Sequence, residues 1–255
     1  MKYVKLFSFI LVLLLAAGCS NSANETEHKI FVSAAASLSG PLNEIVDEFQ
    51  KKYPDTVVTL HFGASGKLAQ QIQQGAPVDV FLSADERRMD ILAEQNMILA
   101  DTRTIFTKNK LVLITNKNSD VSVESLEALS STNLTQITVG NPESVPAGTY
   151  AKQALQNVGV WNELKGNFVF AKDARQVLTY VESGNTNLGF VYVSDLKRSD
   201  LVRGILEVDA DLYEPIVYPA AVISTSENTE QAKTFISFLK SDQAQSILSN
   251  AGFGS

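Results

Sequence analysis

The chain has 255 residues, of which 45% are hydrophobic and 19% are charged, and its formal net charge at pH 7 is −7. This acidic balance, without a cluster of Lys and Arg, argues against a nucleic-acid-binding protein, because such proteins present basic surfaces to phosphate. Cys19 is the only cysteine, so no intramolecular disulfide can form and the fold must be stabilised by its core.

Residues 1–18 predict a targeting segment. Lys2 and Lys5 supply positive charge, an apolar core follows, and the segment ends in Ala-Ala-Gly. Cys19 comes next, so the segment resembles a bacterial lipoprotein signal peptide, in which the cysteine becomes the lipidated N-terminus. Ala16 departs from the leucine that is usual at its place. We expect lipid on Cys19 to hold the protein at the extracytoplasmic face of the cell membrane. A plain signal peptide or a membrane-spanning anchor is the alternative, although the apolar run is short for a span.

Removal of this segment leaves 237 residues with 19 basic and 28 acidic side chains, a formal charge of −9. Residues 19–28 are mostly polar and lack periodicity, which predicts a flexible tether. The remaining length permits either one large domain or two lobes.

The first buried strand is expected within residues 31–38, an apolar run that ends in small residues. Apolar residues then recur at three- and four-residue steps through Phe49, which predicts a helix. Ser37 lies at this junction, where the first N–H groups of a helix lack intrahelical partners and favour an anion. The alternative is that Ser37 and Ser39 are only helix caps.

The same pattern repeats in the next stretch of chain. A second strand is predicted over 56–62, and Ser65 follows it in Gly-Ala-Ser-Gly-Lys before another helix. This is not a phosphate-binding P-loop, because His61 replaces its first glycine and Leu68 its Ser or Thr. A third strand is expected over 78–82, followed by a capping box over 83–86. Three strand-to-helix units predict a mostly parallel sheet.

A second set of strand-to-helix units is predicted from residue 110 onward. Strands are expected over 110–114, 136–139, 168–170 and 187–191, with helices starting near Thr149 and Ala174. Asp173 can cap the second of these helices, with Gln176 three residues later. Residues 215–220 are interpreted as a returning connection, and two amphipathic C-terminal helices are expected to pack on the first set.

Five loops in this order resemble the molybdate-binding proteins of bacterial ABC transporters. The motifs are Ala-Ala-Ser-Leu at 35–38, Gly-Ala-Ser-Gly at 63–66, Gly-Ala-Pro-Val-Asp-Val-Phe-Leu-Ser-Ala-Asp at 75–85, Asn-Pro-Glu-Ser-Val-Pro-Ala-Gly at 141–148 and Leu-Gly-Phe-Val-Tyr at 188–192. The resemblance implies an α/β, two-lobed, periplasmic-binding-protein-like fold of type II, with mostly parallel sheets flanked by helices. It also implies lobe one at 29–106 and 219–255, lobe two at 107–218, and a ligand in the cleft between them.

The resemblance also implies the site. Ser37 and Ser65 would bind the oxyanion through hydroxyl and amide, Ala147 and Ala174 through backbone amides, and Tyr192 through its hydroxyl. Ala174 replaces the valine of many relatives. Without the resemblance, Ala147 and Ala174 are explained by ordinary helix-start packing, and Tyr192 by a strand-end aromatic.

The implied ligand is molybdate or tungstate, which the sequence does not separate. Molybdenum would be bound only as its oxyanion, with no direct metal ligand and no cofactor. The implied partners are the permease and ATPase of an importer, and the protein is expected to be a monomer.

The sequence leaves three alternatives to a molybdate-binding protein. Another tetrahedral oxyanion such as sulfate is the main alternative ligand. A secreted serine hydrolase is disfavoured, because the loop around Ser65 lacks the glycine of a nucleophile elbow and only His28 and His61 are present. A purely structural surface lipoprotein would need no paired lobes. The sequence therefore predicts a binding protein and not an enzyme.

Overall fold

The computed structural model describes residues 28–131 and 136–254. The predicted signal peptide, Cys19 and most of the predicted tether lie outside the described residues. The tether prediction was wrong at its last residue, because His28 begins the first strand and its N–H donates to the Asp55 carbonyl at 2.8 Å. Within the described part of the chain, no helix has the length and apolar character needed to cross a bilayer.

The strands form two five-stranded sheets that share one topology. The first contains, from edge to edge, β2 (Thr56–Gly63), β1 (His28–Ala35), β3 (Val80–Leu82), β10 (Val217–Val222) and β4 (Thr104–Lys108). The second contains β7 (Phe168–Ala171), β6 (Ile137–Gly140), β8 (Leu188–Tyr192), β5 (Leu111–Asn116) and β9 (Val202–Glu207).

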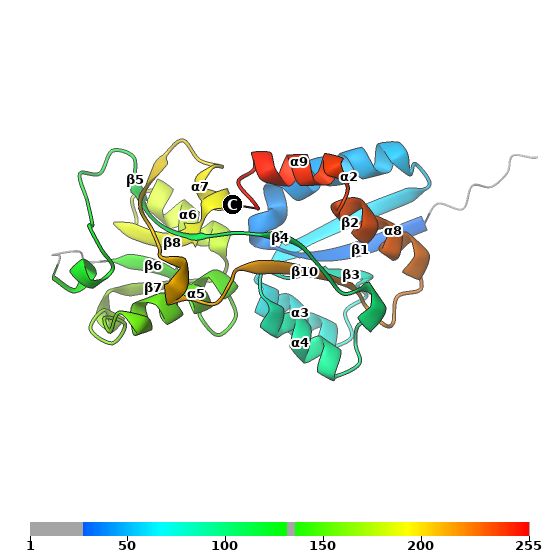
Figure 1. The fold of residues 1–255 in the computed structure, drawn as a ribbon, viewed down its shortest axis with the longest axis horizontal. Helices are drawn as coiled ribbons and strands as arrows, with labels where there is room; N and C mark the ends of the chain where they lie inside the picture. The colour runs from blue at the N-terminus through cyan, green and yellow to red at the C-terminus, as the bar shows by residue number, and fades with distance from the viewer. Residues whose placement is uncertain (1–27, 132–135, 255) are drawn as a thin grey trace, which may run out of the picture.

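The predicted fold class is confirmed by the strand directions in these sheets. In the first sheet only β10 runs against the others, and in the second only β5 does. Each sheet is therefore mostly parallel, and in both the fourth strand of the order given above is the antiparallel one. Two such sheets with flanking helices make a two-lobed α/β fold. Figure 1 shows the two sheets in separate halves of the molecule.

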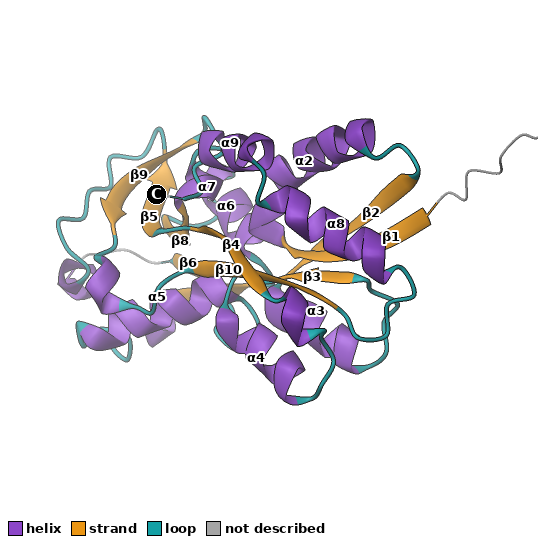
Figure 2. Ribbon diagram, turned by 45° about the vertical axis from the view of Figure 1, so that its right-hand side comes forward, coloured by secondary structure: helices purple, strands orange, loops and turns teal. Residues whose placement is uncertain are grey.

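Helices flank both sheets (Figure 2). The first lobe contains α2 (Ser39–Lys52), α3 (Ser65–Gln73), α4 (Glu86–Glu94), α8 (Thr229–Leu239) and α9 (Asp242–Asn250). The second contains α5 (Pro146–Asn157), α6 (Ala174–Glu182) and α7 (Val193–Leu196). Short 3-10 turns are η2 (Ala36–Leu38), η3 (Ala100–Thr102), η4 (Glu127–Ser131), η5 (Lys165–Asn167) and η6 (Ala210–Leu212).

The C-terminal helices pack on the first lobe, as predicted. The Phe49 ring of α2 lies edge-on to the rings of Phe235 and Phe238 in α8, with centroid distances of 5.1 and 5.5 Å. All three side chains are buried. Such aromatic pairs add to the hydrophobic stabilisation of the core and join the last part of the chain to its first helix.

The chain crosses between the lobes twice, from β4 to β5 and from β9 to β10. Figure 1 shows β4 and β10 side by side between the lobes; they are antiparallel, so β4 runs toward the second lobe and β10 runs back from it. The predicted lobe boundaries, after residues 106 and 218, fall inside these two strands. The boundaries themselves stay a prediction.

Three local predictions were wrong. The first strand ends at Ala35, because Ala36–Leu38 forms a 3-10 turn. Asp85, and not Ser83, caps α4 by accepting from the Arg88 N–H at 3.0 Å. The stretch at 215–220 was interpreted as a connection, but it contributes the start of β10, whose residues are all buried in the first sheet.

Candidate functional site

All five residues predicted from the family resemblance border one cavity between the two lobes. Its volume, taken as the space open to the centre of a water-sized sphere, is about 10 Å3. The lining residues are Ala35, Ala36, Ser37, Gly63, Ala64, Ser65, Ala84, Val145, Pro146, Ala147, Ala174 and Tyr192. The structure therefore brings together lining residues that are up to 157 positions apart in the chain, from Ala35 to Tyr192.

Ser37 and Ser65 come from the first lobe. Ser37 lies in η2, directly after β1, and Ser65 is the first residue of α3, after β2. Because β1 and β2 are parallel neighbours with Ala35 opposite Gly63, the chain leaves both strands at the same sheet edge. This geometry explains why the two serines meet at one cavity.

Ala147, Ala174 and Tyr192 come from the second lobe. Ala147 follows Pro146 in the first turn of α5, and Ala174 is the first residue of α6. The predicted cap of α6 is confirmed, because Asp173 accepts from the Gln176 N–H at 2.8 Å. Tyr192 is the last residue of β8. Two helix N-termini and a strand end therefore face the serines.

The hydroxyl groups of the site have different partners. Ser65 Oγ accepts a hydrogen bond from the Ala84 N–H at 3.0 Å, and Ser37 Oγ lies 2.9 Å from the Tyr218 hydroxyl. The buried Tyr192 hydroxyl has no hydrogen-bond partner of ordinary geometry among the described residues. Burial raises the pKa of Tyr192, so the hydroxyl keeps its proton and can donate. A buried donor without a partner is costly, which points to a ligand at this place.

The cavity offers donors without net charge. None of the described residues that line it has a charged side chain. The first N–H groups of α3, α5 and α6 lack intrahelical acceptors, and the three helix dipoles direct their positive ends toward the cavity. Serine and tyrosine hydroxyls add hydrogens that can be donated. This donor set is suited to a small anion. No group of His, Cys, Asp or Glu in the described chain could hold a metal ion.

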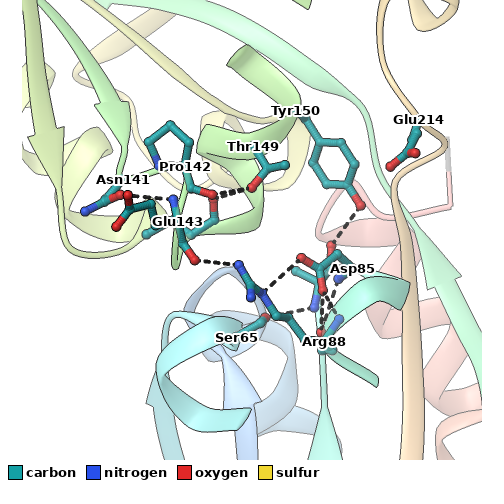
Figure 3. A network of polar contacts seen from close by, with 12 residues as sticks. Ser65, Asp85, Arg88, Asn141, Pro142, Glu143, Thr149, Tyr150 and Glu214 are labelled. Atoms are coloured by element: carbon teal, nitrogen blue, oxygen red, sulfur yellow. Dashed lines mark hydrogen bonds and ion pairs between the residues drawn. The ribbon is translucent and has the colours of Figure 1, made fainter. Parts of the chain in front are cut away.

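The lobes contact each other directly beside the cavity. The Gly66 N–H of α3 donates to the Ser144 carbonyl at 3.0 Å, and the Arg88 guanidinium donates to the Glu143 carbonyl. Figure 3 shows Arg88 reaching from the first lobe to the loop before α5, close to Ser65 and Asp85. These contacts join the two lobes beside the cavity, and the five candidate residues are at most 5% exposed.

A third interlobe contact lies beside these two. The Tyr150 hydroxyl of α5 is 3.4 Å from the Ala84 carbonyl (Figure 3). Ala84 also donates its N–H to Ser65 Oγ, so the same peptide segment contacts a site serine and the opposite lobe. A movement of the lobes that shifts Tyr150 against the Ala84 carbonyl would therefore also shift the N–H that holds Ser65 Oγ.

Sequence reasoning missed several residues that the structure places at the cavity. Ala84 follows β3 at the same sheet edge as Ser37 and Ser65, so the strand-end rule could have found it. Val145 and Pro146 precede Ala147 in the resembling loop, but no signal in the chain marks them as lining residues.

The serine hydrolase alternative has no support in the site. Ser65 Oγ bonds to a backbone amide, and no hydrogen bond joins it to a histidine among the described residues. His61 lies on β2 with an exposed side chain. A nucleophilic serine needs a base within hydrogen-bond reach, and that arrangement is not found here.

Comparisons with known proteins agree with this geometry. The family described as bacterial extracellular solute-binding protein matches residues 30–254. The molybdate-binding protein ModA of Escherichia coli is 37% identical over 256 residues, covering 99% of this chain and 98% of that protein. YvgL of Bacillus subtilis, a candidate substrate-binding lipoprotein of an ABC transporter, is 36% identical over 256 residues with the same coverage of each chain. The structure of the periplasmic molybdate-binding protein of Azotobacter vinelandii superposes with a TM-score of 0.79 at 28% identity, covering 88% of this chain and 98% of that one.

Proposed function

The chain belongs to the family of bacterial extracellular solute-binding proteins, and on that premise we propose that it captures molybdate or tungstate and delivers it to an ABC importer. A solute-binding protein is not an enzyme, so the oxyanion is a ligand for transport and neither a substrate nor a cofactor. Relatives named as molybdate-binding proteins, at identities above 30% over nearly the whole chain, support this choice of ligand.

One observation carries the proposal. Five residues from two lobes line one cavity, and the Tyr192 hydroxyl there is buried with no hydrogen-bond partner among the described residues. We assign ligand binding to Ser37 and Ser65 through hydroxyl and amide, to Ala147 and Ala174 through amides, and to Tyr192 through its hydroxyl. Each of these groups can donate a hydrogen bond to an anion.

The hydrogen-bond donors of the site determine which oxyanions it should prefer. A fully deprotonated dianion presents only acceptors, so every donor of the site can be satisfied. Hydrogen phosphate keeps a proton near neutral pH, and that proton would face another donor, which costs about 1–3 kcal/mol. Phosphate should therefore bind more weakly than molybdate, by tenfold at a cost of about 1.4 kcal/mol and by more toward the upper end of this range. Sulfate matches molybdate in charge but is smaller, so a rigid ring of donors fits only one of them well.

Titration calorimetry on the protein without residues 1–18, the predicted targeting segment, tests the proposal. Molybdate and tungstate should bind most tightly, followed by sulfate and then phosphate, at one fixed ionic strength. At a hundredfold excess over the dissociation constant, ligand should stabilise the fold by about 2.7 kcal/mol. Comparable affinities for phosphate and molybdate would refute a site in which every protein group donates a hydrogen bond to the ligand. No binding of any oxyanion would refute the proposed function.

Closure of the two lobes is part of the proposed function. We assign lobe one to 29–106 and 219–255 and lobe two to 107–218, and ligand contacting both should favour the closed arrangement. Small-angle scattering should show a smaller radius of gyration with saturating molybdate. We propose that the protein acts as a monomer.

The protein is extracytoplasmic in this proposal, with lipid on Cys19 holding it at the cell membrane near its permease and ATPase partners. The small residues before Cys19 and the lipoprotein name of the Bacillus subtilis relative support the anchor. Two acyl chains would make membrane attachment stable, where one would be marginal.

A further inference from the structure

The two serines of the site differ in how their hydrogen bonds are determined. Ser65 Oγ accepts from the Ala84 N–H, and an N–H can only donate. The single hydrogen of the Ser65 hydroxyl is therefore available for another acceptor. Ser65 is fully buried at the cavity wall, so an anion in the cavity is suited to receive that hydrogen.

Ser37 has a partner whose direction the distance does not decide. Its Oγ lies 2.9 Å from the Tyr218 hydroxyl, and either oxygen could be the donor. Tyr218 is on β10, 181 positions from Ser37, and it is fully buried. Tyr218 is not among the described residues that line the cavity. Tyr218 can therefore affect a ligand only through residues that it contacts, such as Ser37 and Tyr192.

The Tyr218 ring is held by aromatic neighbours from several elements. Its centroid is 6.3 Å from that of Phe106 in β4, 6.1 Å from Tyr192 in β8 and 5.3 Å from Phe253 near the C-terminus, all in edge-on geometry. A phenol ring packed in this way keeps its hydroxyl at one place. Burial also raises the pKa of Tyr218, so the hydroxyl keeps its hydrogen.

On the basis of the proposed function, we infer that Tyr218 is a positioning residue that donates to Ser37 Oγ and thereby makes Ser37 an obligate donor to the ligand. Ser37 has one hydrogen. If Ser37 donated it to Tyr218, only the oxygen lone pairs of Ser37 would face the anion, and an anion has no hydrogen to offer them. With Tyr218 as donor, one lone pair of the Ser37 oxygen accepts from Tyr218 and the Ser37 hydrogen is free to turn to the cavity, as at Ser65.

This arrangement makes Tyr218 a determinant of selectivity. With one lone pair of each serine oxygen used inside the protein and each serine hydrogen turned to the ligand, both hydroxyls meet a hydrogen oxyanion as donors and oppose its proton. Without the Tyr218 hydroxyl, Ser37 can rotate and accept that proton. The site would then discriminate less against hydrogen phosphate, while molybdate would still receive the Ser37 hydrogen.

The test compares Tyr218→Phe with Tyr213→Phe as a matched control. Tyr213 is also buried, and its hydroxyl accepts from the Leu111 N–H at 3.2 Å, but it is not among the lining residues. Molybdate and phosphate affinities are measured by calorimetry at pH 7, with melting of each ligand-free protein. In Tyr218→Phe we expect the ratio of molybdate to phosphate affinity to fall by about tenfold. In Tyr213→Phe the ratio should equal that of the wild type.

A second variant keeps the inference testable if Tyr218→Phe does not fold. Ser37→Ala should weaken molybdate binding and leave phosphate binding nearly unchanged, because an obligate donor contributes little to a ligand that presents a proton there. Equal losses for both ions, or an unchanged ratio in folded Tyr218→Phe while the wild type binds molybdate, would overturn the inference alone. A wild-type protein that binds no oxyanion would overturn both the proposed function and this inference.

Discussion

Replacement of Gly66 by alanine is expected to weaken ligand binding without weakening the fold. Gly66 is in the first turn of α3, and a Cβ built on it would lie 2.7 Å from the Ser144 carbonyl oxygen of the other lobe. Ordinary contact begins at 3.4 Å, so the lobes would have to separate by about 0.7 Å at this point. The Cβ would also lie 2.9 Å from Ser144 Cα. Both close contacts are with backbone atoms, so a side-chain rotation cannot relieve them.

The cost falls on the closed arrangement only. Separation stretches the 3.0 Å hydrogen bond from the Gly66 N–H to Ser144, worth about 1 kcal/mol, and overpacking adds about 1 kcal/mol or more. A closed state destabilised by about 2 kcal/mol lowers apparent affinity roughly 30-fold. Alanine also favours helix α3 over glycine by up to about 1 kcal/mol, so melting without ligand should be unchanged or higher.

The assay is molybdate titration calorimetry with ligand-free melting and small-angle scattering. Gly166→Ala is the matched control, because a Cβ at Gly166 would meet nothing within 4 Å. We expect the control to bind like the wild type and Gly66→Ala to contract less on saturation. Wild-type affinity and contraction in Gly66→Ala would refute the assignment of closure to this contact.

Three further predictions follow from the site, the leader and the buried charge. Ser37→Ala and Ser65→Ala should each lower molybdate affinity roughly ten- to a hundredfold in calorimetry, because a hydrogen bond to a charged group is worth about 1.5–3 kcal/mol; unchanged affinity in both would contradict the site. Cys19→Ser should abolish lipid attachment, and intact-mass analysis of wild-type protein that shows cleavage elsewhere and no lipid would contradict the anchor. Asp195→Asn should flatten the pH dependence of ligand-free stability between about pH 4 and 6.

Much of the fold could be predicted because parallel β–α units have a strong local signal. Short apolar runs located β1, β2, β3, β5, β6, β7 and β8. The strands β4, β9 and β10 were missed, and for β10 the reason is physical. β10 contains Pro219, which argues against a central strand because proline cannot donate to a ladder. In the structure β10 is nevertheless interior, and the ladder with β4 shifts register between Tyr218 and Pro219.

The site divides in a similar way. Ser37 and Ser65 could be found from the strand-to-helix junctions alone, since the first N–H groups of a helix favour an anion whatever the family. Ala147 and Ala174 came only from the resemblance, because a backbone amide leaves no mark in residue type. Tyr218 could not be found at all, since its role depends on a contact across 181 positions that no local pattern encodes.

The pH prediction rests on a carboxylate buried beside the site. Burial raises the pKa of Asp195 from 3.8 to about 6, with Asp173 adding to the rise, while Arg198 and the Tyr192 N–H oppose it. The folded state therefore binds this proton more tightly than the unfolded state does. The resulting stability is fully present below about pH 4 and is lost as pH rises through about 6, a change of about 3 kcal/mol.

Asparagine at position 195 keeps an oxygen to accept from the Tyr192 N–H and has no charge to desolvate, so this part of the slope should disappear. Burial also raises the pKa of Asp85, and because Asp85 is present in both proteins its contribution cancels in the comparison. Melting without ligand at pH 4 and 7 measures the difference. The same slope in wild type and Asp195→Asn would mean that the buried carboxylate is not the group that titrates.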